Sequence, residues 1–503
     1  MTTGFSSPNL KTFFIKHQHS IFLLLIILIG LFFRTYDLVN RLEFAHDGDL
    51  QAWIVKDIIV NKHIRLIGQL TSADGIFIGP FYYYLLIPFY LLTNMDPIGA
   101  TIPIIIISIL TIVSYYFVFA KLFKKEIGLI IAFFQAILIP HVLTDRSVVP
   151  TVTTPLWSIW YFYSIILLSR GKFQALPLLA ILIALIWHVH IALLPSLLAI
   201  PVAFLVSKKF PNLKLIIISI ISFLLVSIPF ILFELKHHFS QSHSLITNFT
   251  TNHGGGHGVA KFGLVLTMIS QNLSSLIFYH YPLPINNIYL FLLLFISGLF
   301  LVKKSLLRSA ELISLYAWIF GVIIFFSISS SPISEYYFAN TEVIFLGFVS
   351  FLIYILWKLS KFSHLFVLIS LSIVLLRSLF TFLPDKNYHI GYNERRATAN
   401  YIFNDSRQKN YPCIAVSYIT SPGENVGFRY FFYLKGLHVN QSGSNSPDYT
   451  IVLPEELATS SATAKFGHIG IIPPQKVGTK SEIDYSCSGQ NANLTDPMFG
   501  YTE

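Results

Sequence analysis

Long apolar runs alternate with short polar connections over the first 384 residues of the chain. A run of about 20 apolar residues is long enough to cross the hydrocarbon core of a bilayer as a helix. The pattern therefore predicts eleven membrane-spanning helices. They lie near 20–38, 98–120, 127–143, 152–169, 174–188, 189–206, 215–233, 286–302, 310–328, 341–357 and 363–383.

One further apolar segment, residues 79–92, is predicted to lie in the membrane interface or to dip into the bilayer without crossing it. It is short, contains Pro88 and has Tyr82, Tyr83 and Tyr84 near its start. Segments of this length and composition are typical of the membrane surface. If it were counted as a span, every later connection would change sides.

Clusters of lysine and arginine indicate which side of the membrane each connection faces, because cytoplasmic connections are rich in these residues. The clusters recur at every second connection and comprise Lys11 and Lys16, then Lys121, Lys124 and Lys125, then Arg170 and Lys172, then Lys208, Lys209 and Lys214, then Lys303, Lys304 and Arg308, then Lys358 and Lys361. They predict a cytoplasmic N-terminus and four extracytoplasmic segments, at 39–97, 144–151, 234–285 and 329–340. An odd number of spans places the C-terminal region on that outer side too.

The composition excludes a water-soluble globular protein. Of 503 residues, 54% are hydrophobic and 12% are charged, and the mean hydropathy is +0.66. The net charge of +10 comes largely from the clusters between spans, where anionic lipid headgroups are the expected partners, so nucleic acid is not expected to bind. The first apolar run is too long for a signal peptide and is predicted to be a retained anchor.

The apolar runs end near Leu383, and residues 385–503 are predicted to form a small extracytoplasmic α/β domain that follows a transmembrane domain at 1–384. Strand-like alternation occurs at 413–418 and 448–453. Cys413 and Cys487 both lie in this region, where oxidation is permitted. The two cysteines form either a disulfide or two unpaired thiols, and the sequence does not decide between these alternatives because it gives no distance between the residues.

The first extracytoplasmic loop, 39–97, carries acidic residues at the start of an amphipathic helix. Asp47 and Asp49 are followed by apolar residues at helical spacing, which predicts a helix on the outer leaflet; these are Leu50, Trp53, Ile54 and Ile58. Aspartate is also a favoured helix N-cap. One of the two aspartates can cap this helix, which leaves the other for a chemical role.

An extracytoplasmic carboxylate at the membrane surface suits sugar transfer from a polyprenyl phosphate. The reaction needs a base that takes the proton from the incoming hydroxyl or amine. The leaving phosphate needs a cation or hydrogen-bond donors. Arg146, the single arginine of the 144–151 turn, fits that second role. The alternatives are that it lies in the membrane interface with its charge in water, or that it pairs with Asp145.

These features, in this order, resemble the C-type, polyprenyl-phosphate-dependent glycosyltransferases. That family includes protein O-mannosyltransferases, aminoarabinose lipid A transferases and, more distantly, oligosaccharyltransferase catalytic subunits. The similarity spans about residues 20–385. It comprises an anchor ending at 34–38, an acidic site in the first loop, a proline-tyrosine stretch at 79–84 and an arginine after the third span. The resemblance implies the helical membrane fold of that family and assigns the general base to Asp47.

Two motifs depart from the family pattern. Residues 78–84 look like the family's His-Pro-Pro-Leu-Tyr-Tyr element, but Ile78 and Gly79 replace the histidine and the first proline. Residues 146–148 resemble the second external motif of oligosaccharyltransferases, but 151–153, Thr-Val-Thr, stands where an acidic pair should follow. The missing acidic pair speaks against a divalent metal, so no metal or other cofactor is expected.

Further polar and aromatic residues are candidates for substrate binding. Glu335 and Tyr337 lie in an aromatic segment whose counterpart in the family often helps to bind donor or acceptor, and His46 and Asp49 flank the predicted base. The alternative for the aromatic segment is an ordinary interfacial belt with a solvated Glu335. His188 and His190 are predicted to be polar lining of a cavity, because alternate positions at a helix end point apart and do not suit one metal ion.

The histidine-rich stretch at 237–257 contains three consecutive glycines and is either a mobile gate over the cavity or a plain loop.

The sequence thus predicts an inverting glycosyltransferase of the plasma membrane. It would move a sugar from a polyprenyl-phosphate donor to a lipid, protein or glycan acceptor on the extracytoplasmic face. Asp47 is the predicted base, and the residues predicted to bind substrates are Asp49, Arg146, Glu335, Tyr337 and His46. The alternatives are a flippase or transporter of lipid-linked glycans, and a scaffold or sensor that works through its outer domain. Transporters place ionisable residues within their spans, whereas here they lie mostly at the ends of the spans, which favours the enzyme.

Overall fold

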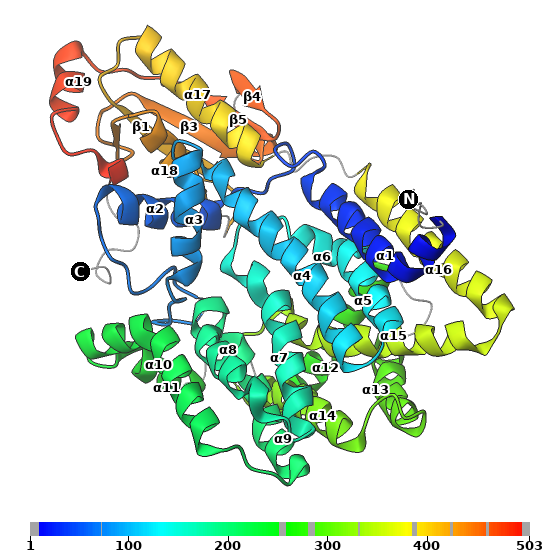
Figure 1. Cartoon of the computed structure of the whole chain (residues 1–503). Helices are drawn as coiled ribbons and strands as arrows, with labels where there is room; N and C mark the ends of the chain where they lie inside the picture. The colour runs from blue at the N-terminus through cyan, green and yellow to red at the C-terminus, as the bar shows by residue number, and fades with distance from the viewer. Residues whose placement is uncertain are drawn as a thin grey trace, which may run out of the picture.

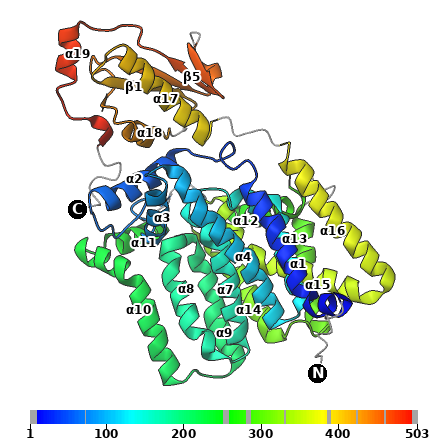
Figure 2. The same cartoon turned by 45° about the horizontal axis from the view of Figure 1, so that its top comes forward.

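The computed structural model describes residues 10–71, 73–250, 258–279, 287–329, 332–384, 390–422, 426–458 and 462–494. These residues form a bundle of helices with a small α/β domain at one end (Figures 1 and 2). We call this end of the bundle the domain end. In both views α10 and α16, residues Leu213–Lys236 and Lys361–Phe382, lie at opposite edges of the bundle.

Each predicted span coincides with helical structure. The segments are α1 Leu10–Thr35, η1 Pro97–Ala100 with α4 Thr101–Leu122, α5 Lys125–Ile137 with α6 Ile139–Thr144, η2 Pro150–Thr153 with α7 Thr154–Ser169, η3 Phe173–Ala175 with α8 Leu176–Val189, η4 Ile191–Leu198 with α9 Ala199–Ser207, α10, α13 Asn287–Lys303, α14 Ser309–Ile328, η5 Glu335–Thr341 with α15 Glu342–Leu359, and α16. Within the described residues, seven helical segments are long and apolar enough to cross a membrane. The remaining four are shorter or interrupted, so the total of eleven spans stays a prediction.

The segment at 79–92 forms a short helix, α3 Phe81–Leu92, with Pro88 inside it. Twelve residues at 1.5 Å each extend about 18 Å, which is less than the roughly 30 Å hydrocarbon core. This length agrees with an interfacial or re-entrant segment.

The described part of the predicted extracytoplasmic segment at 234–285 is largely helical. It contains α11 Ser240–Thr250 and α12 Val259–Phe278. Gly258, the residue just before α12, donates a backbone hydrogen bond to the carbonyl of Ser327 at the end of α14. The next helix after α12 is α13. His253 and His257, on which the gate interpretation depends, lie outside the described residues.

Three of the basic clusters meet at the end of the bundle opposite the domain end. Arg170 donates from Nε to Glu311 at 2.6 Å, and its guanidinium also donates to the carbonyl of Leu122 at 3.3 Å. Leu122 ends α4. At the other end of the same helical segment, Asp96 precedes η1 and accepts a hydrogen bond from Tyr392 of the C-terminal domain. The predicted topology places these three basic clusters on one side of the membrane, and their position at one end of the bundle agrees with it. Which side is cytoplasmic stays a prediction.

The C-terminal domain has a mixed five-stranded sheet in the order β2-β1-β3-β5-β4. Its elements are α17 Tyr392–Gln408, β1 Ile414–Thr420, α18 Arg429–Leu434, β2 Val439–Asn440, β3 Asp448–Leu453, η6 Glu455–Leu457, β4 Ala464–Phe466, β5 Ile469–Ile472, α19 Lys480–Ser486 and η7 Ala492–Leu494. β1 pairs in parallel with β2 and β3, and β5 pairs antiparallel with β3 and β4. The two predicted strands are confirmed as β1 and β3. A disulfide joins Cys413 to Cys487, so the paired alternative holds.

The C-terminal domain and the first loop share one hydrophobic core. Phe44 of the loop lies 4.9 Å from Phe431 between ring centroids, and Trp53 lies 6.0 Å from Tyr430. All four residues belong to one cluster of buried side chains. The division predicted at 384/385 therefore separates two parts of the sequence whose cores are joined.

Candidate active site

Asp47 lies in the first turn of α2, His46–Val60, with an exposed side chain. The N-cap residue is Ala45, so neither aspartate caps this helix. Among the described residues, no hydrogen bond or ion pair holds the Asp47 carboxylate. The unpaired backbone N–H groups of a first helical turn favour negative charge at this position. His46 is exposed beside it.

The predicted helix is confirmed as α2, but its apolar face is not open to lipid, and Gln51 and Lys56, which were predicted to lie off that face, are buried too. Trp53, Ile54 and Val55 are at most 4% exposed and pack inside the core shared with the C-terminal domain. The prediction that this face lies on the outer leaflet is therefore wrong. The C-terminal domain, which the sequence pattern could not place, covers it.

Other polar groups lie near Asp47. The pKa of the Glu43 carboxyl is raised by loss of hydration and then by the negative charge of Asp47. The pKa of the Tyr83 hydroxyl is also raised, mainly by burial, and Asp47 adds to the effect. One turn after Asp47, Gln51 donates from Nε2 to the carbonyl of Val148 at 2.5 Å. The helix that carries Asp47 therefore contacts the 145–149 connection directly.

Asp49 faces the C-terminal domain. Its side chain is 4% exposed, and Oδ1 accepts a hydrogen bond from the backbone N–H of Tyr430 at 2.8 Å. Burial raises the pKa of Asp49 to about 7, against the opposing effects of the Tyr430 N–H, Arg429 and Arg395. The structure therefore places this predicted substrate ligand in a contact between the first loop and the C-terminal domain.

Arg146 is bound to the end of α1. It is 6% exposed, and Nη1 donates to the carbonyls of Phe33 at 2.9 Å and Tyr36 at 3.0 Å. Asp145 pairs instead with Arg34, at 2.5 Å. The predicted alternative of an Arg146–Asp145 pair is wrong, because Asp145 is paired with the buried Arg34 and Arg146 is bound to backbone carbonyls. The predicted contact of Arg146 with a phosphate stays a prediction.

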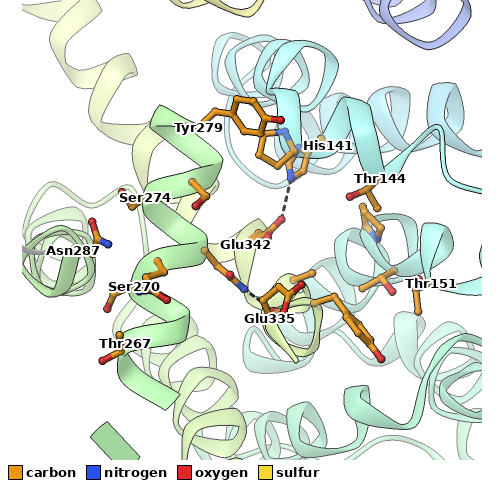
Figure 3. A pocket seen from close by; sticks show the side chains of 18 of the residues that line it. His141, Thr144, Thr151, Thr267, Ser270, Ser274, Tyr279, Asn287, Glu335 and Glu342 are labelled. Atoms are coloured by element: carbon orange, nitrogen blue, oxygen red, sulfur yellow. Dashed lines mark hydrogen bonds and ion pairs between the residues drawn. The ribbon is translucent and has the colours of Figure 1, made fainter. Parts of the chain in front are cut away.

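A cavity of about 1170 Å³ lies among α6, α7, α12, η5 and α15 (Figure 3). Polar side chains from all of these elements line it. They include hydroxyls of Thr144, Thr151, Thr154, Ser270, Ser274 and Ser275, amides of Gln271, Asn272 and Asn287, and the ionisable groups of His141, Glu335 and Glu342. Glu335 is the one predicted site residue in this lining. Thr144 and Thr151 flank the 145–149 connection that Gln51 contacts, so α2 and the cavity share this connection.

His141 and Glu342 are joined by a hydrogen bond in the cavity wall, with Nε2 and Oε2 2.9 Å apart (Figure 3). Neither residue is among the site residues predicted from the sequence, because both lie at the ends of apolar runs that fit membrane spans. The available signal was their position, since ionisable residues in predicted membrane segments are rare and often functional.

A second cavity, of about 330 Å³, lies on the other side of η5. Tyr337 and His190 line it together with first-loop residues at 71–76. His188 lies elsewhere, stacked on Phe81 with ring centroids 3.8 Å apart. The prediction of a polar cavity lining is therefore confirmed for His190, whereas His188 is not in the lining of either cavity. η5 places Glu335 in one cavity and Tyr337 in the other.

The described parts of the chain contain no group of three or more His, Cys, Asp or Glu side chains that could hold a metal ion. The expected independence of metal stays a prediction.

The fold resembles those of solved structures of an ArnT and of an archaeal oligosaccharyltransferase. No protein-family model matches the sequence, and no curated protein matches it either. The structure resembles ArnT from Cupriavidus metallidurans bound to undecaprenyl phosphate, over 92% of this chain and 99% of that chain, with a TM-score of 0.56 and 10% identity. It also resembles the oligosaccharyltransferase of Archaeoglobus fulgidus in the apo form, over 84% of this chain and 64% of that chain, with a TM-score of 0.52 and 14% identity.

A structure of the same oligosaccharyltransferase tethered to an acceptor peptide gives a TM-score of 0.51 at 12% identity, over 88% of this chain and 69% of that chain. The similarity to ArnT includes nearly the whole of both chains. The chain therefore has the C-type glycosyltransferase fold, as the sequence motifs predicted.

Proposed function

We propose that this protein is an inverting glycosyltransferase that moves a sugar from a polyprenyl phosphate to an acceptor on the extracytoplasmic face of the membrane. The observation that carries the proposal is the exposed Asp47 carboxylate at the start of α2, which has no partner among the described residues, within a fold shared with ArnT and an archaeal oligosaccharyltransferase. The ArnT structure holds undecaprenyl phosphate, and one of the oligosaccharyltransferase structures holds an acceptor peptide. The first is the kind of carrier lipid that would leave in the proposed transfer, and the second is one kind of acceptor.

Asp47 acts as the general base. Its carboxylate takes the proton from the acceptor hydroxyl or amine as that atom attacks the anomeric carbon. The new bond forms on the face opposite the phosphate, and the bond from the anomeric carbon to the phosphate oxygen breaks. The polyprenyl phosphate leaves with the electron pair, so one displacement inverts the anomeric configuration.

The leaving phosphate needs donors, and Arg146 is the candidate. Nη1 is used on the carbonyls of α1, while Nη2 is buried with no hydrogen-bond partner among the described residues. A phosphate oxygen at Nη2 would satisfy this donor. Glu335 and Tyr337 line the two cavities on either side of η5, where the sugar rings of donor and acceptor would lie. His46 is exposed next to Asp47 and would contact the acceptor.

The test is transfer by the purified protein in liposomes, with a panel of polyprenyl-phosphate hexoses and pentoses and a membrane extract of the source organism as acceptor. Asp47→Asn is expected to lower the rate by about 10²–10⁴-fold, the usual contribution of a general base. Its thermal unfolding should match that of the wild type, because the side chain is exposed and unpartnered. Asp484→Asn, on the exposed face of α19, is the matched control. Transfer by Asp47→Asn at the wild-type rate would contradict the assignment.

A further inference from the structure

We infer that the large cavity binds an uncharged sugar residue and discriminates against sugars that carry carboxylate, sulfate or phosphate groups. This inference rests on the proposed function and names the class of sugar that the enzyme handles. Three properties of the cavity wall support it: its charge, an unpartnered nitrogen of His141 and the kind of polar groups that line it.

The first property is charge. Glu335 and Glu342 line the cavity, and the lining that the structure describes contains no lysine or arginine. Lys261, on the same helix as several lining residues, is bound to the carbonyl of Ser329. An anionic sugar would lose hydration inside the cavity and meet two carboxylates with no lysine or arginine in the described lining to compensate its charge.

The second property is the hydrogen-bonding state of His141. Its side chain is 5% exposed, and Nε2 lies 2.9 Å from the Glu342 carboxylate. Nδ1 is an acceptor in the neutral ring and a donor in the protonated ring. Nδ1 is buried without a partner among the described residues. A sugar hydroxyl can pair with Nδ1 in either state because it both donates and accepts, whereas a carboxylate or sulfate oxygen can only accept.

The third property is the remaining lining. Hydroxyls and amides project into the cavity from α6, η2 and α12, including Thr144, Thr151, Ser270 and Ser274 (Figure 3). Each such group can both donate and accept, as sugar hydroxyls do. The volume of about 1170 Å³ exceeds the usual range of roughly 300–1,000 Å³ for small-molecule sites. The cavity therefore has room for a sugar with its neighbouring groups.

A cysteine introduced into the wall reports the charge of the cavity. Cys413 and Cys487 are joined to each other and there are no free cysteines, so an added thiol is the single reactive one. Thr144 is suitable because its side chain is exposed within the cavity (Figure 3). The full-length Thr144→Cys protein in detergent is treated with cationic, neutral and anionic methanethiosulfonates, and each rate is divided by the rate for free cysteine amide.

We expect the cationic reagent to react at least about tenfold faster than the anionic one, because two carboxylates face the thiol. Glu342→Gln in the same background should reduce that ratio several-fold. Thr151→Cys serves as a second reporter if Thr144→Cys does not fold. A ratio near one, or a faster anionic reagent, would overturn the inference.

Ligand protection tests the class of sugar. Neutral methyl hexosides should slow labelling, and glucuronate at the same concentration should not. Protection by a polyprenyl-phosphate hexose, with none from a polyprenyl phosphate that lacks a sugar, would assign the cavity to the donor. Protection by a soluble neutral oligosaccharide would assign it to the acceptor. Equal protection by glucuronate would overturn the inference. Labelling requires no turnover, so its failure is distinct from failure of the Asp47 transfer assay.

Discussion

The carboxylate of Asp49 in α2 accepts a hydrogen bond from the backbone N–H of Tyr430 in α18, at 2.8 Å, although 381 positions separate the two residues. Asp49 thereby binds the first turn of a helix in the C-terminal domain, two positions from the proposed base. Close backbone contact accompanies this bond, since a Cβ on Gly427 would lie 2.4 Å from the carbonyl oxygen of Ala45. The position of Asp47 is therefore linked to the docking of the C-terminal domain.

This contact should depend on pH. Burial raises the pKa of Asp49 from 3.8 to about 7, so the docked state binds the proton more tightly than the unfolded state. Its contribution to stability is complete below pH 4 and is lost as the pH rises through about 7. We expect the docked domain to be less stable at pH 8 than at pH 5, by on the order of 2 kcal/mol. Hydrogen exchange of the α18 amides measures this difference.

Two variants test the origin of that pH dependence. Asp49→Asn retains an oxygen that accepts from Tyr430 but does not ionise, so its α18 amides should exchange with little change between pH 5 and pH 8 after correction for the intrinsic rate. Asp484→Asn should keep the wild-type profile. An Asp49→Asn protein with the wild-type pH dependence would show that another group titrates.

The buried pair of Arg34 and Asp145 should be important for the stability of the bundle. Arg34 is fully buried and also bonds to Ser108 at 2.7 Å and to the carbonyl of Gln135 at 2.9 Å, so it joins α1 to α4 and α5. Replacing Asp145 by Asn leaves a buried guanidinium without its counter-charge. We expect the free energy of unfolding to fall by about 3–5 kcal/mol, which denaturant or thermal unfolding in detergent measures.

The double change Arg34→Met with Asp145→Leu removes both charges and should recover part of that loss. The control is Arg308→Gln, because Arg308 is 70% exposed in its pair with Glu311 and should change stability by less than about 1 kcal/mol. Equal effects of Asp145→Asn and Arg308→Gln would contradict the interpretation.

The hydrophobic periodicity of the sequence predicted the positions of the helices better than the tertiary contacts between them. Apolar runs located the spans, because the length of a bilayer-crossing helix is set by the membrane. α12 was missed because Ser270, Gln271 and Asn272 interrupt its apolar run. Val265, Ile269, Leu273 and Leu276 still recur at helical spacing and are buried, so the signal of a one-sided helix was present.

The candidate site was predictable only in part, for a related reason. The position of Asp47 at the start of a helix follows from local sequence. The pair of His141 and Glu342 joins residues 201 positions apart, and the role of Asp49 depends on Tyr430. Such contacts depend on tertiary packing, and the spacing of residues along the chain carries no information about them.

The disulfide between Cys413 and Cys487 should stabilise the C-terminal domain. It connects the start of β1 to the end of α19 and closes a loop with a sequence separation of 74. Closing a loop of that length removes conformational entropy from the unfolded state, which predicts a loss of about 2–4 kcal/mol on reduction. Thermal unfolding with and without reductant measures this loss, and a double Cys→Ser variant should be insensitive to reductant. Free thiols in protein from untreated cells would contradict the pairing and the predicted extracytoplasmic location.

Arg146 should have two separable roles. Nη1 binds two carbonyls at the end of α1, and the buried Nη2 is the proposed phosphate donor. Arg146→Lys keeps the charge but has a single nitrogen, so it cannot serve the carbonyls and a phosphate with the same geometry. Arg146→Gln loses the charge as well. Both variants should lower the melting temperature by a similar amount, while the KM for the lipid-linked donor should rise more in Arg146→Gln, by about tenfold or more. Steady-state kinetics and unfolding measured on the same preparations separate the two roles. If both variants unfold earlier but bind the donor with an unchanged KM, Arg146 only holds α1, and the phosphate is bound by other residues.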